Sequence, residues 1–565
     1  MASAPHAVSS CPVGSSWLGG APIPSPRSGA TLVATDLVRF HGAAPILDGV
    51  SLTVAPGTRL GVVGPNGVGK TTLLRILAGL DQPDGGRLTL APPSLTVGYL
   101  PQEAEPVPGE TLLAFLARRT GVAAAEAELE SAAAALAQAS PGADDAYGVA
   151  LDRYLALGGP DLEVRANVVC ADLGLAADRL DVEVGQLSGG QVARGASAAI
   201  LLSRVDVLLL DEPTNDLDFA GLDRLERFLT DLAGGLVVVS HDRTFLANTV
   251  ERVLELDEHR RTATEFGGGW QGYLEAKAVA RRHAEEAHTG YQVQAGVLAS
   301  RAAVQRQWAV TGVRKAKTQA PDNDKAIRGF KVNRTEKQAA KVPITERAIE
   351  RLEVVDKPWE GWDLHMELGS SARSGKVVAR LVGAVVERGS FRLGPIDLEV
   401  AWADRLAILG PNGSGKTTLL GALLGEVPLA EGHQALGPGV VVGRLDQGRH
   451  RFPAGETLLR GFVDASGLRP EPIRSLLAKF GLAAGDVERP AGSLSPGERT
   501  RAGLALLMAG GANCLVLDEP TNHLDLPAIE QLEQALETYD GTLLLVTHDR
   551  RLLEEVRITR SVELG

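Results

Sequence analysis

The sequence predicts an α/β protein that contains two tandem, related domains joined by a long α-helical hairpin. Two glycine-rich loops of one pattern each lie between an apolar run and a helix-forming stretch. The same further motifs follow each loop in the same order, and the residues between the two series are rich in helix formers. At 565 residues the chain is longer than one hydrophobic core normally supports, which agrees with more than one domain.

Both glycine-rich loops fit the pattern G-x-x-x-x-G-K-[ST]. Residues 60–63 and 406–409 are the expected strands before them, and residues 72–78 and 418–424 the expected helices after them. In such a loop, backbone N–H groups surround the phosphates, the lysine reaches the β- and γ-phosphates, and the threonine hydroxyl ligates Mg²⁺. The expected nucleotide-binding residues are Gly64, Pro65, Asn66, Gly67, Val68, Gly69, Lys70, Thr71 and Thr72, and in the second copy Gly410, Pro411, Asn412, Gly413, Ser414, Gly415, Lys416, Thr417 and Thr418.

Each copy continues with a strand-like apolar run that ends in two adjacent carboxylates. We expect the first acid to hold Mg²⁺ and the second to polarise an attacking water, which requires a carboxylate within hydrogen-bond reach. A second β-rich run ends in a histidine 30 residues after the first acid, placed to contact the γ-phosphate. The residues in these roles are Asp211, Glu212 and His241 in the first copy and Asp518, Glu519 and His548 in the second.

The remaining repeated motif is residues 187–191, Leu-Ser-Gly-Gly-Gln, matched by Leu-Ser-Pro-Gly-Glu at residues 494–498. With this motif the chain resembles the ATP-binding cassette (ABC) superfamily. The resemblance implies an ATPase with ATP and Mg²⁺ as cofactors. It also implies that each such loop, at the N-terminus of a helix, binds the γ-phosphate of the nucleotide held by the opposite cassette.

The resemblance therefore implies two composite sites. The first combines Lys70, Thr71, Gln102, Asp211, Glu212 and His241 with Ser495, Gly497 and Glu498. The second combines Lys416, Thr417, Gln447, Asp518, Glu519 and His548 with Ser188, Gly189, Gly190 and Gln191. The family's adenine-stacking aromatic is expected at Phe40 or His41 in the first copy, whereas the stretch around Glu387 and Arg388 offers none in the second. Because the two signature loops differ, the two sites are expected to turn over at different rates.

The spacing between motifs locates an insertion. The signature serine, the metal aspartate and the histidine recur at an offset of 307 residues, but the phosphate-loop lysines lie 346 apart. The first copy thus carries 39 extra residues between phosphate loop and signature. The lysine-to-glutamine distance is 32 residues in the first copy and 31 in the second, so nearly all the excess follows Gln102. Since residues 123–130 and 132–139 are strongly helix-forming, we expect a helical arm at about residues 104–165.

The chain has a formal net charge of -13, but residues 301–341 carry +8 and the rest -21. A solvated pair of charged helices would explain the basic run alone. On an acidic protein, however, a concentrated basic segment favours a polyanion partner. We expect a helix over residues 274–309, breaks at Thr311-Gly312 and at residues 321–324, and a second helix over residues 335–352. The candidate RNA-binding residues are Arg314, Lys315, Lys317, Lys325, Arg328 and Lys331.

Tandem cassettes with an arm and a helical linker resemble the ABC-F family of translation-associated ATPases. Residues 266–274 resemble the stretch that enters that family's linker, and residues 354–360 the stretch that leaves it. The resemblance implies that the ATP-closed form binds the ribosomal exit (E) site, with the linker tip at the P-site tRNA and ribosomal RNA near the peptidyl-transferase centre. The arm would face the stalk beside the E site, and hydrolysis would release the protein. Some members protect ribosomes from antibiotics, so resistance is a subsidiary hypothesis.

Two other function classes are open from the residues alone. An energy subunit of a membrane transporter also pairs two cassettes, but it leaves the basic hairpin unexplained. A DNA-maintenance ATPase usually carries zinc-ligand cysteine clusters or very long coiled coils, and this sequence has neither. No apolar run approaches the roughly 18 to 20 residues that cross a bilayer, and three scattered cysteines fit a reducing compartment. We therefore expect a cytoplasmic monomer with its cassettes paired within the chain, without a membrane subunit or DNA as partner.

The predicted organisation follows from these observations. Residues 1–30, rich in Ala, Ser, Pro and Gly, are expected to form a disordered tail, because they lack the charged segment and apolar core of a signal peptide. Two ABC ATPase domains are expected at residues 31–276 and 375–565, with the basic helical linker at residues 277–374 between them.

Overall fold

The computed structural model describes residues 29–318 and 373–565, except for residues 43, 103–106, 216, 259, 390, 446–451, 454, 495 and 523. The chain divides into two compact units, of which one contains both repeats and the other spans residues 272–363. The predicted fold class, two tandem α/β domains of the phosphate-loop type with a helical segment between them, is confirmed.

Each repeat contains one antiparallel and one mainly parallel sheet. In the first repeat the antiparallel sheet has the order β2-β1-β4, formed by β1 (Thr31–His41), β2 (Ala44–Val54) and β4 (Gly85–Ala91). The other sheet has the order β5-β6-β7-β3-β8-β9 and contains β3 (Arg59–Val63), β5 (Val97–Leu100), β6 (Val207–Asp211), β7 (Gly235–Val239), β8 (Arg252–Leu256) and the antiparallel β9 (Ala263–Gly267).

The second repeat has the same architecture. Its antiparallel sheet has the order β11-β10-β13, formed by β10 (Val377–Arg388), β11 (Phe391–Ala401) and β13 (Glu431–Leu436). Its parallel sheet has the order β14-β15-β16-β12-β17, formed by β12 (Arg405–Leu409), β14 (Val442–Leu445), β15 (Cys514–Asp518), β16 (Thr542–Val546) and β17 (Arg560–Glu563).

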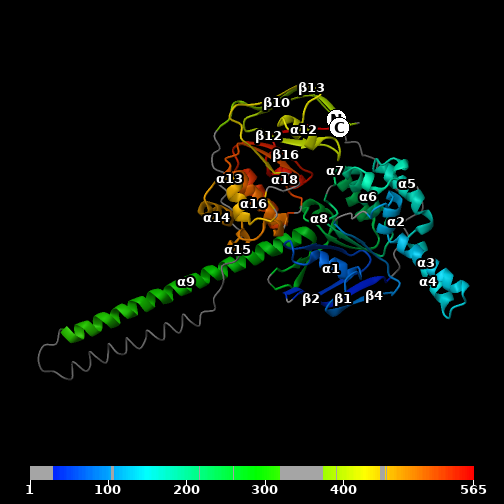
Figure 1. Cartoon of the computed structure of the whole chain (residues 1–565). Helices are drawn as coiled ribbons and strands as arrows, with labels where there is room; N and C mark the ends of the chain where they lie inside the picture. The colour runs from blue at the N-terminus through cyan, green and yellow to red at the C-terminus, as the bar shows by residue number, and fades with distance from the viewer. Residues whose placement is uncertain are drawn as a thin grey trace, which may run out of the picture. The chain divides into compact units, whose positions relative to one another are not determined.

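One helix joins the two sheets of each repeat through a shared hydrophobic core. In the first repeat, leucines 73, 74 and 77 of α1 (Lys70–Leu77) pack with residues of β1, β2, β3 and β6. Figure 1 shows α1 beside β1 and β2. In the second repeat α12 (Lys416–Leu423) packs in the same way. Both helices begin two residues before the predicted starts, at the phosphate-loop lysine, so the loop runs directly into the first helical turn.

A helical region follows in each repeat. The first repeat has α2 (Leu112–Arg119), α5 (Leu162–Asp172), α6 (Gly189–Leu202), α7 (Phe219–Asp231) and α8 (Arg243–Thr249). The second has α13 (Leu458–Ser466), α14 (Pro470–Lys479), α15 (Ala484–Val487), α16 (Pro496–Ala509), α17 (Leu526–Glu537) and α18 (Arg550–Glu555). Short 3-10 turns η1 (Gly159–Asp161), η2 (Ala177–Arg179), η3 (Val184–Gln186) and η4 (Ala491–Ser493) complete these regions.

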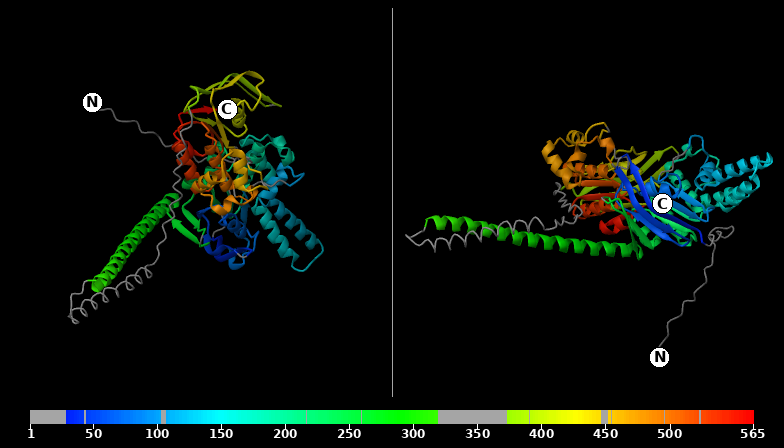
Figure 2. Two further views of the ribbon diagram at one scale, coloured as in Figure 1. Left: turned by 60° about the vertical axis from the view of Figure 1, so that its left-hand side comes forward. Right: turned by 90° about the horizontal axis from the view of Figure 1, so that it is seen from below.

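The extra residues of the first repeat form a helical pair. Thr111 and Thr457, the N-caps of α2 and α13, lie 346 residues apart, which is the offset of the phosphate loops. The next pair of equivalent helices, α5 and α14, lie only about 307 residues apart, so the extra residues fall between α2 and α5. Between α2 and α5 lie α3 (Val122–Ala137) and α4 (Ala143–Ala156), side by side in the views of Figure 2 (cyan), but only residues 467–469 separate α13 from α14. The two helices without a counterpart, α3 and α4, thus lie inside the expected arm, whereas α2 has a counterpart in the second repeat, α13.

The segment after the first repeat is one long helix, α9 (Gly269–Thr318), green in Figure 1. Its 50 residues correspond to about 75 Å at 1.5 Å per residue. The predicted break at Thr311-Gly312 is wrong, because α9 continues through both residues. One glycine costs a helix only about 1 kcal/mol, and the lysines, arginine and alanine around it favour the helix. The predicted second helix and Lys325, Arg328 and Lys331 lie outside the described residues, whereas Arg314, Lys315 and Lys317 lie near the end of α9.

In the described part of the chain, no helix combines the length and the apolar character needed to span a membrane.

Candidate functional site

Strand order brings the predicted motifs together at one edge of each parallel sheet. Strands β6, β7 and β3 are neighbours, and so are β15, β16 and β12. The phosphate loop follows β3, the two carboxylates follow β6, and the histidine follows β7, and the second repeat has the same arrangement. Because the carboxyl ends of parallel strands lie at the same edge of a sheet, residues from three distant parts of the chain meet there.

The phosphate loops have the backbone that their glycines predict. Gly69 has φ +112° and Gly415 φ +98°, in the region that side chains rarely adopt. A Cβ atom on Gly69 would lie 2.6 Å from Ile46, and one on Gly415 would lie 2.7 Å from the ring of Phe391. Both positions therefore favour glycine, because a side chain would be strained at this φ and would contact Ile46 or Phe391 too closely.

Each phosphate-loop lysine is folded over its own loop. Lys70 Nζ donates to the carbonyl oxygens of Gly64 at 2.7 Å and Pro65 at 3.1 Å. Lys416 Nζ donates to Gly410 O at 2.9 Å and Pro411 O at 3.2 Å. Burial lowers the pKa of both lysines, and nearby carboxylates partly offset that effect. The loops thus present a lysine ammonium together with the N-terminus of a helix, an arrangement that suits phosphates.

The threonine and first carboxylate of each repeat fit a magnesium ion. Thr417 Oγ1 donates to Asp518 Oδ2 at 2.8 Å, so two hard oxygen donors lie together. In the first repeat Asp211 accepts from Tyr99 at 3.4 Å, and burial raises the pKa of Asp211 while its hydrogen bond with Thr71 lowers it. The described residues contain no cluster of three or more acidic, histidine or cysteine ligands. The threonine hydroxyl and the aspartate carboxylate suit a magnesium ion that also binds nucleotide phosphates.

The second carboxylates stand on strained backbone. Glu212 has φ +50° and Glu519 φ +47°, and each backbone N–H donates to a strand carbonyl, Val239 O or Val546 O, at 2.9 Å. Such conformations cost about 1–3 kcal/mol and persist where the surrounding structure fixes them, often at functional sites. Burial raises the pKa of Glu212 to about 7, which suits a general base near neutral pH.

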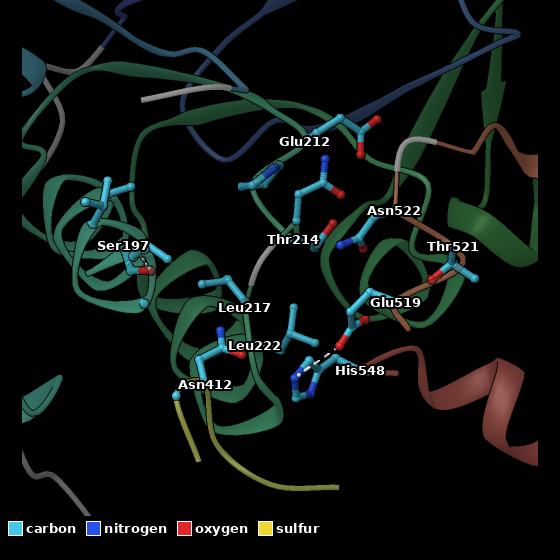
Figure 3. A pocket seen from close by; sticks show the side chains of 18 of the residues that line it. Ser197, Glu212, Thr214, Leu217, Leu222, Asn412, Glu519, Thr521, Asn522 and His548 are labelled. Carbon is cyan, nitrogen blue, oxygen red and sulfur yellow. Dashed lines mark hydrogen bonds and ion pairs between the residues drawn. The ribbon is translucent and has the colours of Figure 1, made fainter. Parts of the chain in front are cut away.

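The histidines face these glutamates, as Figure 3 shows for Glu519 and His548. His241 Nε2 lies 3.3 Å from Glu212 Oε1, and His548 Nε2 lies 3.5 Å from Glu519 Oε1. His548 Nε2 also lies 2.9 Å from Lys416 Nζ. Burial, assisted by Lys416, lowers the pKa of His548 to about 4, and burial with Lys70 lowers that of His241. Both lowered pKa values favour the neutral form of the imidazole.

The second composite site is assembled around a cavity of about 1020 Å³ lined by both repeats. From the second repeat Lys416, Thr417, Asp518, Glu519 and His548 line it, and from the first repeat Gly189 and Gly190 at the start of α6. A Cβ on Gly190 would lie 4.0 Å from the backbone carbon of Asn412. Ser188 and Gln191 form a capping box, in which each side chain accepts from the other's backbone N–H, at 3.4 and 2.9 Å. The predicted juxtaposition of signature helix and opposite phosphate loop is therefore present in the structure.

The structure describes the first composite site in part. Gln102, Asp211, Glu212 and His241 also line the cavity. Ser495 and Gln447 lie outside the described residues. Gly497 and Glu498 lie in the first turn of α16, and Glu498 Oε1 accepts from Arg489 at 3.3 Å. In the first signature the corresponding Gln191 caps its own helix.

Two aspartates that the sequence analysis left without a role join the repeats. The Asp218 carboxylate caps α7 by accepting from Gly221 N at 2.8 Å and also accepts from Asn412 N, in the opposite phosphate loop, at 3.0 Å. Asp525 caps α17 and accepts from Asn66 N at 3.2 Å. Their shared offset of 307 was the available sequence signal. The contacts are reciprocal, so each phosphate loop is bonded by the other repeat.

Reciprocal ion pairs lie beside these aspartates. Arg243, only 5% exposed, pairs with Glu533 of the second repeat. Its counterpart Arg550 pairs with Glu226 at 3.0 Å and Asp223 at 2.5 Å in the first repeat. Both arginines directly follow the His-Asp pair of their own repeat. The histidine segment of each repeat is thereby attached to the helix that follows the opposite carboxylates.

An aromatic residue that the sequence analysis did not identify lies at the second phosphate loop. Phe391 and Arg388 are register partners in the β10–β11 pair, and both line the cavity. In the first repeat the pair that closes the same hairpin is His41 and Ala44, and Phe40, which is 46% exposed, precedes His41 in β1. The aromatic side chain has thus moved to the neighbouring strand, which is why a search around Glu387 and Arg388 did not find it.

Comparisons with known proteins agree with this geometry. The model of the ABC transporter family matches residues 47–215 and 393–522. The tylosin resistance ATP-binding protein TlrC of Streptomyces fradiae is 38% identical over 518 residues, covering 90% of this chain and 92% of that protein. The energy-dependent translational throttle protein EttA of Mycobacterium tuberculosis is 32% identical over 534 residues, covering 91% and 88%. The archaeal ribosome recycling factor aABCE1, solved with stalk protein aP1, shares the fold at TM-score 0.56 and 21% identity, covering 94% and 87%.

Proposed function

This chain belongs to the ABC-F family of ATP-binding cassette proteins, and from that membership we propose that it is a cytoplasmic, ribosome-associated ATPase that occupies the ribosomal E site in its ATP-closed form. It hydrolyses ATP through its paired cassettes. In the proposal the linker acts on the P-site tRNA and the peptidyl-transferase centre, and hydrolysis releases the protein. The partners are ribosomal RNA and tRNA, and the cassettes pair within one monomer.

One observation carries the ATP-driven part of this proposal, namely the reciprocal hydrogen bonds from Asn412 N to Asp218 and from Asn66 N to Asp525. Nucleotide phosphates bind to the same loops. A loop ordered by phosphate presents its asparagine N–H to the opposite cassette in a fixed position. Nucleotide binding and pairing of the cassettes therefore favour one another, which is what a protein that binds its target only in the closed state requires.

The chemical roles follow from the two sites. Lys70 and Lys416, with the loop N–H groups, bind the phosphates. Mg²⁺, when bound, neutralises charge on the β- and γ-phosphates, and the residues proposed to hold it are Thr71, Gln102 and Asp211, or Thr417, Gln447 and Asp518. Glu212 and Glu519 accept the proton of the attacking water. Neutral His241 and His548 hydrogen-bond the γ-phosphate, and the signature of the opposite cassette completes each site. Phe391 is proposed to stack on the base in the second cassette.

The relatives favour a ribosomal role over transport. TlrC is named for tylosin resistance and EttA for a translational throttle, and this chain aligns with about nine tenths of each. An energy subunit of a membrane transporter remains the alternative function, but it gives the basic run at residues 301–341 no purpose. Similarity to TlrC also supports antibiotic resistance by ribosome protection as a proposed physiological role.

The experiment that tests the proposal is ATP-dependent co-sedimentation with ribosomes. The double variant Glu212→Gln, Glu519→Gln binds ATP but lacks both bases, so we expect it to pellet with ribosomes in ATP and not in ADP. The matched control, Lys70→Ala with Lys416→Ala, removes phosphate binding and should stay in the supernatant. Equal pelleting in ATP and ADP, or none, would contradict the proposal, whereas co-purification with membrane subunits would support the alternative.

The linker is tested separately. Arg314→Ala with Lys315→Ala should weaken ribosome binding and reduce its salt dependence, because two phosphate contacts are lost. ATP binding should be unchanged in this variant. A fall in ATP binding instead would contradict the separation between the cassettes and a linker that contacts RNA.

A further inference from the structure

The imidazole of His548 is in contact with an aromatic ring from the other repeat. The ring of Phe219 lies 5.3 Å from that of His548, centroid to centroid, at an interplanar angle of 76°. This is the edge-to-face arrangement that aromatic pairs prefer. Phe219 belongs to the first cassette, whereas His548 belongs to the second, so the contact crosses between the cassettes at the second composite site.

The backbone of Phe219 is fixed on the same surface. Phe219 is the first residue of α7, directly after Asp218. The Asp218 carboxylate accepts from Gly221 N at 2.8 Å within α7 and from Asn412 N at 3.0 Å in the phosphate loop of the second cassette. Two adjacent residues of the first cassette therefore contact two parts of the opposite site, its phosphate loop and its histidine.

His548 is bound on its other side by polar groups of its own cassette. Its Nε2 lies 2.9 Å from Lys416 Nζ and 3.5 Å from Glu519 Oε1. The imidazole turns about its Cβ–Cγ bond, and the edge-to-face contact from Phe219 restricts this rotation. Orientation matters because a hydrogen bond to a phosphate weakens steeply when donor and acceptor are misaligned.

The first composite site is different at this position. The residue equivalent to Phe219 is Leu526, the first residue of α17, directly after the capping Asp525. Asp218 and Asp525 make equivalent contacts with the opposite phosphate loops, and α7 and α17 begin directly after them. The backbone arrangement is therefore the same in the two sites, and the side chain after the aspartate differs. A leucine has no ring with which to orient an imidazole.

We propose that Phe219 is a positioning residue for ATP hydrolysis at the second composite site, supplied by the first cassette to orient the catalytic histidine of the second. Hydrolysis at that site then depends on the contacts that Asp218 and Phe219 of the first cassette make with Asn412 and His548. Hydrolysis at the first site does not depend on an aromatic contact of this kind. The inference deepens the proposed function, because it rests on the roles given above to Glu519 and His548, and it does not depend on the ribosome.

Phe219→Leu is a conservative test, because leucine already occupies the equivalent position of the second repeat. It should be made in a Glu212→Gln background, where only the second site hydrolyses ATP. The rate of ADP formation is measured in a single turnover of pre-bound labelled ATP, and ATP affinity by binding of a fluorescent analogue. We expect the rate to fall about three- to tenfold, the range for loss of one aromatic pair, with unchanged affinity. Phe219→Tyr keeps the ring and should restore the rate.

The matched control is Phe219→Leu in a Glu519→Gln background, where only the first site hydrolyses ATP and the rate should not change. An equal fall in both backgrounds, no fall in either, or no rescue by tyrosine would overturn the proposal. The double variant Glu212→Gln, Glu519→Gln shows whether the glutamates act as bases, and so separates an error in that assignment from an error in the role of Phe219. If it still hydrolyses ATP, the glutamates are not the bases; if it does not and Phe219→Leu has no effect, only the positioning role fails.

Discussion

The two cassettes have the same catalytic motifs at the same sheet edge, but the neighbours of those motifs differ. In the first cassette Tyr99 donates to the metal-site aspartate, Asp211, at 3.4 Å. The equivalent residue of the second is Arg444, whose guanidinium pairs with Glu426. The second site has the ring of Phe219 against its histidine and Phe391 at its phosphate loop. The two repeats thus share the motifs proposed to bind nucleotide, whereas the residues around those motifs differ.

The largest expected effect comes from the catalytic glutamates. Glu212→Gln with Glu519→Gln should reduce steady-state ATP hydrolysis by a factor of about 10² to 10⁴, the range for loss of a general base. Each single variant reports the other site, so comparing the two single-turnover rates measures the asymmetry directly. Equal rates in Glu212→Gln and Glu519→Gln would contradict the idea of two unequal sites.

Arg243 and Arg550, which form the reciprocal ion pairs, are expected to contribute unequally to stability. Arg243→Ala should destabilise the protein by about 3 kcal/mol, because Arg243 is only 5% exposed and the substitution leaves Glu533, which is 11% exposed, without this partner. Arg550 is 26% exposed, so Arg550→Ala should cost about 1 kcal/mol or less. Urea unfolding followed by circular dichroism measures both values. A larger loss for Arg550→Ala would reverse the predicted order.

The capping aspartates give a smaller effect. Asp218→Ala loses both the helix cap, worth about 1 kcal/mol, and the bond to Asn412 N. We expect ATP binding at the second site to weaken by about tenfold, which is 1.4 kcal/mol. Asp218→Asn keeps the accepting oxygen for the cap and should lose less. Titration with a fluorescent ATP analogue checks this order, and identical affinities for the alanine variant and the parent protein would contradict it.

The smallest expected effect is that of removing the Tyr99 hydroxyl, which is present only at the metal site of the first cassette. Tyr99→Phe removes only a long hydrogen bond to Asp211, of 3.4 Å, so the net cost should be about 0.5 kcal/mol. In a Glu519→Gln background, the Mg²⁺ concentration that gives half-maximal hydrolysis should change less than about threefold. The same substitution in a Glu212→Gln background should leave the second site unchanged. A large shift there would mean that Tyr99 acts on both sites.

The sequence predicted much of the fold and many of the polar residues that line the cavity. The strand order brings the phosphate loops, carboxylates and histidines together at one sheet edge. These motifs could be predicted because each has a local pattern that also specifies the strand, turn or helix beside it. The predicted break at Thr311-Gly312 failed because one glycine among helix formers is too small a penalty to end a helix. Phe391 was missed because the β10–β11 register, which no local pattern specifies, places it opposite Arg388.

The sequence by itself determined that there are two cassettes, which groups are proposed to bind the phosphates, and that the first cassette carries extra helices. These properties depend on residue type and spacing within short stretches, and repetition at an offset of 307 reinforces them. Only the tertiary structure decided which residues of one cassette contact the other. Asp218 and Asn412 are 194 residues apart, so their hydrogen bond depends on how two folded surfaces pack. The same holds for Phe219 and His548, whose contact distinguishes the two sites.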